Sequence, residues 1–158
     1  MVRMEVTVRP ATHSDIPCVV EIEQLSFRYP YPEGLLRAYL ALAGDGFMVA
    51  VAEGKVVGYV IGVIERGNVG HVISLAVRPS WRRHGIGKLL LSSLLCYFGK
   101  HNVPRVYLEV RRSNSAAAAL YKRYGFKEAG VITNYYPDCE DAIVMVLELG
   151  QHKKGAHG

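Results

Sequence analysis

The sequence predicts an α/β protein with a mixed central sheet of about six to seven strands, flanked by about four helices. Three observations favour this class. Apolar runs typical of strands dominate the first half of the chain, helical and strand patterns alternate in the second half, and turn residues separate them. We therefore expect antiparallel pairing first, and parallel pairing where a helix connects two strands.

The first segments include two short helices. A half-buried strand carries Val6, and a helix with one apolar side opens at Ser14. Two prolines make 27–32 a loop rich in aromatic residues, because each removes a backbone donor and biases its predecessor toward extended geometry. A second helix is expected over 33–43, closed by Gly44.

A three-strand meander follows. Two apolar segments, 47–52 and 56–64, are joined by Glu53 and Gly54, a turn pair typical of a hairpin. A third strand is expected over 71–77, after a glycine-rich turn.

The remaining half alternates helices with strands. We expect, in chain order, helix 86–99, strand 105–110, helix 115–124 and strands 126–131 and 142–149.

The composition fits one folded domain. The chain has 158 residues, of which 50% are hydrophobic and 21% are charged, enough to bury a continuous core. Its apolar stretches fall far short of the roughly 18 to 20 residues that cross a bilayer, and its first residues lack the apolar core of a secretory signal. We expect one domain over 1–150, a cytoplasmic location, no membrane association and a disordered tail over 151–158.

The segment 82–88 combines two glycines with positive charge between a strand and a helix. Gly85 and Gly87 let the backbone approach a ligand, and the following helix directs unsatisfied N–H groups toward it, which suits a phosphate. The cationic side chains of this turn are Arg82, Arg83 and Lys88.

Other phosphate motifs do not match this segment. A Rossmann fingerprint needs a third glycine where Leu90 stands, and a Walker A loop needs glycine at Arg82 and Ser or Thr at Leu89. A plain glycine turn with a solvated basic face stays open as the structural alternative. The three cysteines and six histidines have no metal-binding spacing, so no metal site is expected.

A second motif makes the pattern specific. Asn114 precedes Ala117, Tyr121 and the pair Gly125-Phe126 on one helix. With the loop, it resembles the GNAT superfamily of acetyl-CoA-dependent N-acetyltransferases. The family's R/Q-x-x-G-x-G/A loop matches 82–87, and its N-x-x-A-x-x-L-Y-x-x-x-G-F helix matches Asn114 through Phe126. The resemblance spans residues 5 to 149 and is greatest to N-terminal protein acetyltransferases, both archaeal and RimI-like.

The resemblance implies the GNAT fold, with parallel strands around the cofactor, and acetyl-CoA as acetyl donor with coenzyme A as product. By the same resemblance, the strand before the loop is expected to hold the pantetheine arm and the loop to hold the pyrophosphate. Tyr121 is expected to bond the thioester sulfur and protonate the departing thiolate, and His71 and Glu109 to form a paired base that acts through ordered water. The implied cofactor-binding residues are Leu75, Ala76, Val77, Arg82, Arg83, His84, Gly85, Ile86, Gly87, Lys88, Asn114, Ala117 and Tyr121.

The implied base is matched to a terminal amine. An α-amine is neutral in roughly a tenth of molecules near pH 7, whereas a lysine amine is neutral in about one of a few thousand. Only mild help is then needed to take a proton. The structural alternatives are a strand-end histidine for His71 and a core tyrosine for Tyr121, whereas a carboxylate at Glu109 inside an apolar run is costly without a partner.

Two aromatic loops resemble the walls that clamp a protein's first residues in this family. They contribute Phe27, Tyr29, Tyr31, Tyr135 and Tyr136. Related archaeal enzymes carry a glutamate in the first loop, where this chain has phenylalanine or arginine. We therefore expect small or hydrophobic first residues rather than acidic ones. The expected partners are protein or peptide N-termini, with nascent chains and ribosomal proteins as sources, and the expected state is a monomer or weak homodimer.

Two other functions stay open. Acetylation of a polyamine or amino sugar usually calls for an acidic pocket, against which the aromatic loops argue. A non-catalytic nucleotide- or RNA-binding module is permitted by the formal charge of +5. Part of that charge is Lys153 and Lys154 in the tail, so too little remains for a nucleic-acid surface. No specific nucleic acid is expected.

Overall fold

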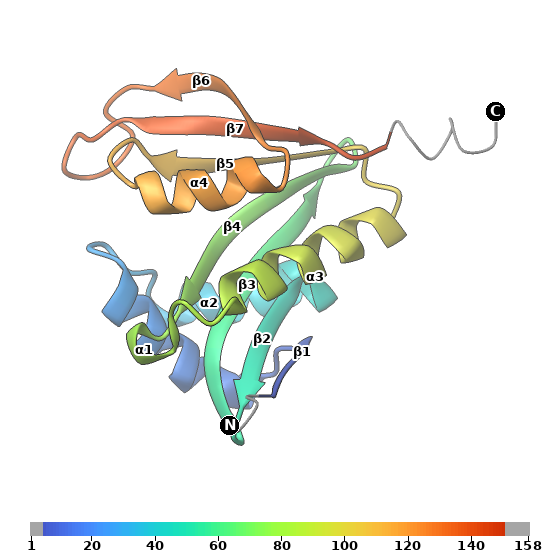
Figure 1. Ribbon diagram of the computed structural model, residues 1–158, viewed down its shortest axis with the longest axis vertical. Helices are drawn as coiled ribbons and strands as arrows, with labels where there is room; N and C mark the ends of the chain where they lie inside the picture. Colours follow the sequence, from blue (N-terminus) through green and yellow to red (C-terminus); the bar gives the residue numbers. More distant parts are fainter. Residues whose placement is uncertain (1–4, 151–158) are drawn as a thin grey trace. The chain divides into compact units, whose positions relative to one another are not determined.

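The computed structural model describes residues 5–150 (Figure 1). The helices are α1 (Ile16–Ser26), α2 (Glu33–Ala43), α3 (Ile86–Lys100) and α4 (Ser115–Arg123). The strands are β1 (Val6–Pro10), β2 (Phe47–Ala52), β3 (Lys55–Glu65), β4 (Val69–Val77), β5 (Arg105–Arg111), β6 (Lys127–Ile132) and β7 (Ala142–Glu148). These are the elements that the sequence predicts, with bounds that differ by two residues or fewer.

The strands form a seven-stranded sheet in the order β1-β2-β3-β4-β5-β7-β6. β1 pairs antiparallel with β2, and β2 with β3, whereas β4 and β5 are parallel. The chain divides into two compact units. The first holds the residues up to Val63 and Ser74–Tyr97, and the second holds Ile64–Ile73 and the residues from Phe98 onward, so β3 and β4 contribute to both.

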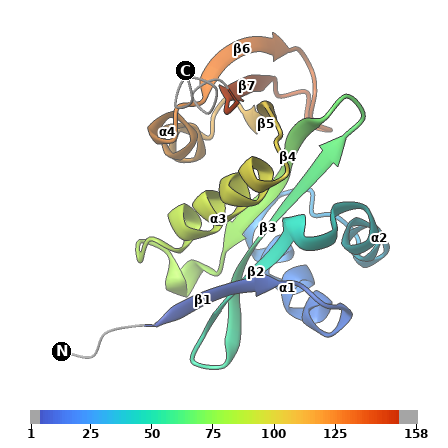
Figure 2. The same cartoon turned by 90° about the vertical axis from the view of Figure 1, so that its right-hand side faces the viewer.

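In the first unit, helices cover both faces of the strands. α1 and α2 lie on one face and α3 on the opposite face (Figure 2). β2 is consequently buried except at Val51, and β3 is buried over 56–62, which explains why their sequences are apolar without alternation. Glu53 (φ 52°) and Gly54 (φ 72°) both adopt the left-handed conformation, as the expected tight hairpin turn requires.

In the second unit, β7 lies between β5 and β6 and pairs antiparallel with each (Figure 1). The parallel pairing expected across α4 is therefore wrong, because β5 and β6, the strands that α4 connects, are not neighbours. The apolar strand β7 fills the place between them. β5 alternates buried and half-buried residues, so Tyr107, Glu109 and Arg111 share its less buried face.

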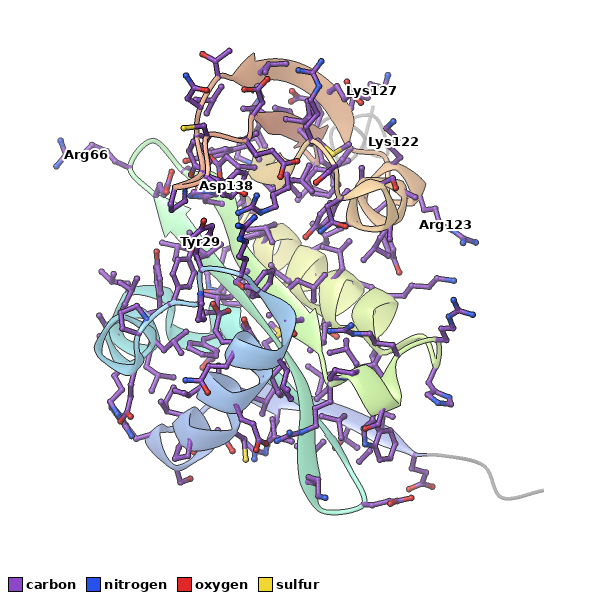
Figure 3. All side chains as sticks on the ribbon, turned by 90° about the vertical axis from the view of Figure 1, so that its left-hand side faces the viewer. Tyr29, Arg66, Lys122, Arg123, Lys127 and Asp138 are labelled. Atoms are coloured by element: carbon purple, nitrogen blue, oxygen red, sulfur yellow. The ribbon has the colours of Figure 1, made fainter. Side chains whose placement is uncertain are left out.

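The turn between β3 and β4 is shorter than the sequence predicts. It occupies only three residues, of which Gly67 (φ 87°) and Asn68 (φ 61°) have left-handed backbones. Both strands therefore extend farther, and Glu65 becomes the last residue of β3. Arg66 projects outward from this turn (Figure 3).

Two sequence-based expectations concern larger parts of the chain. The disordered tail expected over 151–158 lies outside the described residues, and the single domain expected over 1–150 stays a prediction. Between residues 5 and 150, no helix is both long enough and apolar enough to span a bilayer.

Candidate active site

The glycine loop lies in the first unit, between β4 and α3. Arg83 (φ 67°) and Gly85 (φ 79°) turn the backbone through the left-handed region. The carbonyl of Gly85 accepts the N–H of Leu89 at 3.0 Å, so α3 starts immediately after the loop. A Cβ at Gly85 would meet no atom within 4 Å, so the space beside this backbone is open. An open glycine turn at a helix N-terminus fits a pyrophosphate.

The cations of the loop have different surroundings. The Arg82 guanidinium donates to the Val77 carbonyl at 3.0 Å and to Ser26 Oγ at 3.3 Å, so it fastens the loop to the end of β4 and to α1. Arg83 and Lys88 are exposed. We therefore infer that Arg82 holds the loop in position, and we expect Arg83 and Lys88 to supply positive charge for a phosphate.

The other expected cofactor residues of this unit flank the loop. On β4, Ala76 is buried while Leu75 and Val77 are half-buried. Ile86 anchors the start of α3 in the core, and Gly87 is half-buried beside it. His84 is exposed, with its ring centroid 6.3 Å from that of Trp81.

A buried carboxylate fixes the first aromatic loop. Glu23 on α1 is 2% exposed, and its Oε2 accepts the backbone N–H of Tyr31 at 2.7 Å. Its Oε1 accepts the hydroxyl of Tyr59, and Ser74 Oγ lies 3.3 Å away. We call Glu23, Tyr59, Ser74 and the Tyr31 N–H the Glu23 cluster. Burial and the adjacent Glu23 charge raise the pKa of Tyr59 well above its usual value.

The aromatic residues of this loop differ in exposure. Tyr29 is 42% exposed, and the Arg28 guanidinium lies 5.6 Å from its ring centroid. Phe27 and Tyr31 are half-buried, and the Tyr31 ring lies 6.2 Å from that of Tyr39.

The second unit brings together His71 and Glu109, as the resemblance implies. His71 Nε2 lies 2.8 Å from Glu109 Oε1, and its Nδ1 lies 2.8 Å from Glu65 Oε2. Tyr107 donates its hydroxyl to Glu65 Oε1 at 2.6 Å and stacks on the His71 ring with centroids 4.1 Å apart. We call Glu65, His71, Tyr107 and Glu109 the His71 cluster.

Backbone pairing explains this geometry. His71 on β4 lies directly opposite Tyr107 on the parallel strand β5, and Glu109 follows two residues later on the same face. Glu65 reaches Nδ1 because the three-residue turn places the end of β3 six residues before His71. Within residues 5–150, no group of three or more His, Cys, Asp or Glu is arranged to hold a metal ion.

The contacts of this cluster shift the pKa values of its members. Burial lowers the pKa of His71, but the hydrogen bonds and charges of Glu109 and Glu65 outweigh it, so the pKa is raised overall. Burial alone would raise the pKa of Glu65. The hydrogen bonds from Tyr107 and His71 outweigh burial, so the pKa of Glu65 is lowered overall. Desolvation and the Glu65 contact raise the pKa of Tyr107.

The expected residues of α4 are ordered by capping and packing. Asn114 Oδ1 accepts the N–H of Ala117 at 3.1 Å, so it caps the helix. Tyr121 is buried, with its ring 5.6 Å from that of Phe126. Burial, with a smaller effect of Tyr136, raises the pKa of Tyr121, so its phenol keeps its proton at neutral pH.

The second aromatic loop is held by Arg111 at the end of β5. Its Nη1 lies 3.0 Å from Asp138 and 2.7 Å from Glu140, and its guanidinium lies 4.2 Å from the Tyr136 ring centroid. Tyr135 stands edge-on to Tyr136 at 4.9 Å. Figure 3 labels Asp138 on this loop. Desolvation raises the pKa of Tyr136 to about 12.

Among the contributing residues that lie beyond the predicted set, Glu23, Tyr107 and Glu65 differ in the sequence signal that could have found them. Glu23 lies four residues after buried Val19, so a charged residue on the apolar side of a helix was the available signal. Tyr107 shares the face of Glu109 by simple alternation. Glu65 had no sequence signal of its own, because its role depends on the length of the turn.

Comparison with known proteins shows that this chain is an acetyltransferase of the GNAT class. The family model described as Acetyltransferase (GNAT) family matches residues 16–126, and this chain belongs to that family.

Full-length relatives agree with this assignment. An N-alpha-acetyltransferase of Sulfurisphaera tokodaii is 39% identical over 157 residues, covering 92% of this chain and 94% of the relative. The ribosomal protein bS18 alanine N-acetyltransferase of Escherichia coli is 32% identical over 148 residues, covering 90% of this chain and 97% of the relative. The crystal structure of Ard1 from Thermoplasma volcanium superposes with a TM-score of 0.89 at 31% identity, covering 91% of this chain and 97% of Ard1.

Proposed function

We propose that this protein transfers an acetyl group from acetyl-CoA to the α-amine at the N-terminus of proteins. The contact between His71 and Glu109 carries the proposal, since a half-buried carboxylate paired with an imidazole at 2.8 Å is a combination that can take a proton from an amine. The names of the relatives support it, because they are an N-alpha-acetyltransferase and an alanine N-acetyltransferase of a ribosomal protein.

Most of the residues that we propose for binding of the acetyl donor belong to the first unit. The backbone of the open turn at Gly85 and the first N–H groups of α3 would hold the pyrophosphate, assisted by Arg83 and Lys88. The backbone of the strand segment 75–77 would hold the pantetheine arm. Asn114, the N-cap residue of α4, and Ala117 on α4 are the proposed cofactor-binding residues of the second unit.

Proton transfer falls to the second unit. Acetyl-CoA, when bound, would supply a thioester. The neutral amine attacks its carbonyl carbon directly, so the C–N bond forms while the carbonyl oxygen takes up negative charge, and the C–S bond then breaks as the carbonyl re-forms. Glu109, paired with His71, takes one proton from the amine through water. Tyr121 gives its phenol proton to the departing thiolate and regains one from solvent. A backbone N–H near Leu75 is the proposed oxyanion donor.

Substrate selection falls to the two aromatic loops. Tyr29, Tyr31 and Tyr136 offer apolar and aromatic surface rather than charge to a first residue. The first loop contributes no carboxylate between Phe27 and Pro32. We therefore propose a preference for small or hydrophobic first residues, with protein N-termini, including those of ribosomal proteins, as substrates.

The test is a panel of peptides that differ only in their first two residues, incubated with acetyl-CoA and read by mass spectrometry. Peptides beginning with Ala, Ser or Met should be acetylated at the α-amine. A matched peptide with a blocked α-amine and an internal lysine should react poorly. Preferred acetylation of that lysine, or of spermidine, would contradict an N-terminal substrate, and preference for Asp- or Glu-starting peptides would contradict the proposed selectivity.

A further inference from the structure

The His71 ring lies between two carboxylates, and this contact pattern restricts its protonation. Each ring nitrogen is 2.8 Å from a carboxylate oxygen, Nδ1 from Glu65 and Nε2 from Glu109. An ionised carboxylate can only accept hydrogen bonds. Both ring nitrogens are therefore satisfied together only when both carry protons, which is the imidazolium form.

Glu65 is itself held as an acceptor. Its Oε1 accepts the Tyr107 hydroxyl at 2.6 Å while its Oε2 faces His71. The Tyr107 ring also stacks on the imidazole at an interplanar angle of 13°, which fixes the ring's orientation. The Glu65 side chain is 38% exposed, against 15% for His71 and 17% for Glu109, so the cluster is only partly shielded from water.

We propose that Glu65, oriented by Tyr107, is a positioning residue that holds His71 as an imidazolium against Glu109, leaving the Glu109 carboxylate as the group that accepts the amine proton. This inference rests on the proposed function and divides the paired base into two roles. An imidazolium has no lone pair on nitrogen and cannot accept a proton. His71 then orients Glu109 and balances its charge, and Glu109 makes the transfer.

The groups that bear on the charge of His71 come from two strands of the unit, β3 and β5. Glu65 at the end of β3 and Glu109 on β5 both stabilise the charged ring. Tyr107 on β5 acts through Glu65, because its hydroxyl bonds that carboxylate rather than the imidazole. The raised pKa of His71 agrees with this geometry.

The test is a titration of His71 by NMR, using protein labelled with ¹⁵N-histidine and His71→Gln to assign its signals. In the wild-type chain, both ring nitrogens should report the protonated state at pH 7, with a midpoint above the usual histidine value of about 6.5. Glu65→Gln should lower that midpoint and reduce kcat by roughly tenfold or more through lost positioning, with the KM for acetyl-CoA unchanged. Tyr107→Phe keeps the stacked ring. It should lower the His71 midpoint and kcat as Glu65→Gln does, but by less.

Glu148→Gln is the matched control, because it removes an exposed carboxylate of the same unit that pairs with Arg105. It should leave the His71 midpoint and kcat at wild-type values. If the His71 midpoint of Glu65→Gln equals that of the wild type, the proposal is overturned, whether or not kcat falls. If Glu65→Gln does not fold, an unchanged His71 midpoint in Tyr107→Phe overturns the proposal instead. Absence of peptide acetylation by the wild-type chain would refute the proposed function, whereas the titration tests the His71 charge independently.

Discussion

The Glu23 cluster and the His71 cluster place carboxylates in opposite surroundings. Glu23 is 2% exposed, and its partners are two hydroxyls and a backbone N–H, all of them neutral. Glu65 and Glu109 are part-exposed, and an imidazole lies between them. A buried carboxylate with neutral donors fixes the chain around it, whereas a part-exposed carboxylate beside a titratable ring can exchange protons with a substrate and with water.

This difference predicts that mutations in the two clusters impair different properties of the protein. Changes in the His71 cluster should act mainly on rate, and changes in the Glu23 cluster mainly on stability.

The largest expected effect is that of Glu109→Gln on turnover. Removing a general base typically costs about 10²- to 10⁴-fold in rate. We expect a kcat loss in that range with an unchanged KM for acetyl-CoA, measured by steady-state acetylation of an Ala-starting peptide. The free energy of unfolding should change by only about 1 kcal/mol, since Glu109 is part-exposed. A variant that keeps wild-type kcat would show that another group takes the proton.

Glu23→Ala should instead lower stability. It removes the acceptor of the Tyr31 N–H and of the Tyr59 and Ser74 hydroxyls. Because these hydroxyls lie 2.9 Å apart and can still bond each other, two donors lose their partner, at about 1 to 3 kcal/mol for each. We expect urea denaturation to show a loss of about 3 kcal/mol or more. The peptide KM should also rise, because the first aromatic loop loses its anchor. Tyr59→Phe removes a single donor and should cost less; wild-type stability of Glu23→Ala would remove the basis of the comparison.

A smaller effect is expected at the glycine loop. Alanine at Gly85 would meet no neighbouring atom but must adopt a φ of 79°, which costs an L-residue about 1 to 2 kcal/mol. We expect the loop of Gly85→Ala to relax out of the left-handed conformation and to return to it only when the donor binds, which should raise the KM for acetyl-CoA about fivefold to tenfold with little change in kcat. Gly34→Ala, on helix α2 with equally open space, is the control and should leave both constants unchanged. An unchanged KM in Gly85→Ala would argue against a role for this turn in donor binding.

The smallest effect is a pH dependence of stability from His71. Because its pKa is raised in the folded chain, its stabilisation is complete below the unfolded value of about 6.5 and is lost as pH rises through the folded value. The free energy of unfolding should therefore fall over that range. His71→Gln should flatten this decline in urea titrations at several pH values. An identical slope in wild type and variant would mean that the His71 charge does not contribute.

The sequence predicts local structure well here because local signals are strong. The Glu53-Gly54 turn, the prolines of the first loop and the glycine that ends α2 each set a boundary that the structure confirms. The position of β7 between β5 and β6 could not be predicted in the same way. It depends on which strands pair over long distances, and neither the strand pattern nor the connecting helix specifies that.

The candidate sites follow the same division. The cofactor roles of the motif residues in the loop and on α4 stay predictions. His71 contacts Glu109 because adjacent parallel strands bring the two residues together. The role of Glu65 could not be predicted, because a change of one or two residues in the length of the turn decides whether its carboxylate reaches the His71 imidazole. Arg82 and Asn114 carry structural contacts that a motif alone does not reveal.

The most direct test of Glu109 as the proton acceptor compares wild type with Glu109→Gln on one Ala-starting peptide. Acetylation rates are measured at several pH values, and mass spectrometry locates the modified nitrogen. We predict that wild type modifies the α-amine and that the variant is at least a hundredfold slower at every pH where wild type is folded. Equal rates for the two proteins, or acetyl groups found on lysine instead of the first residue, would contradict it.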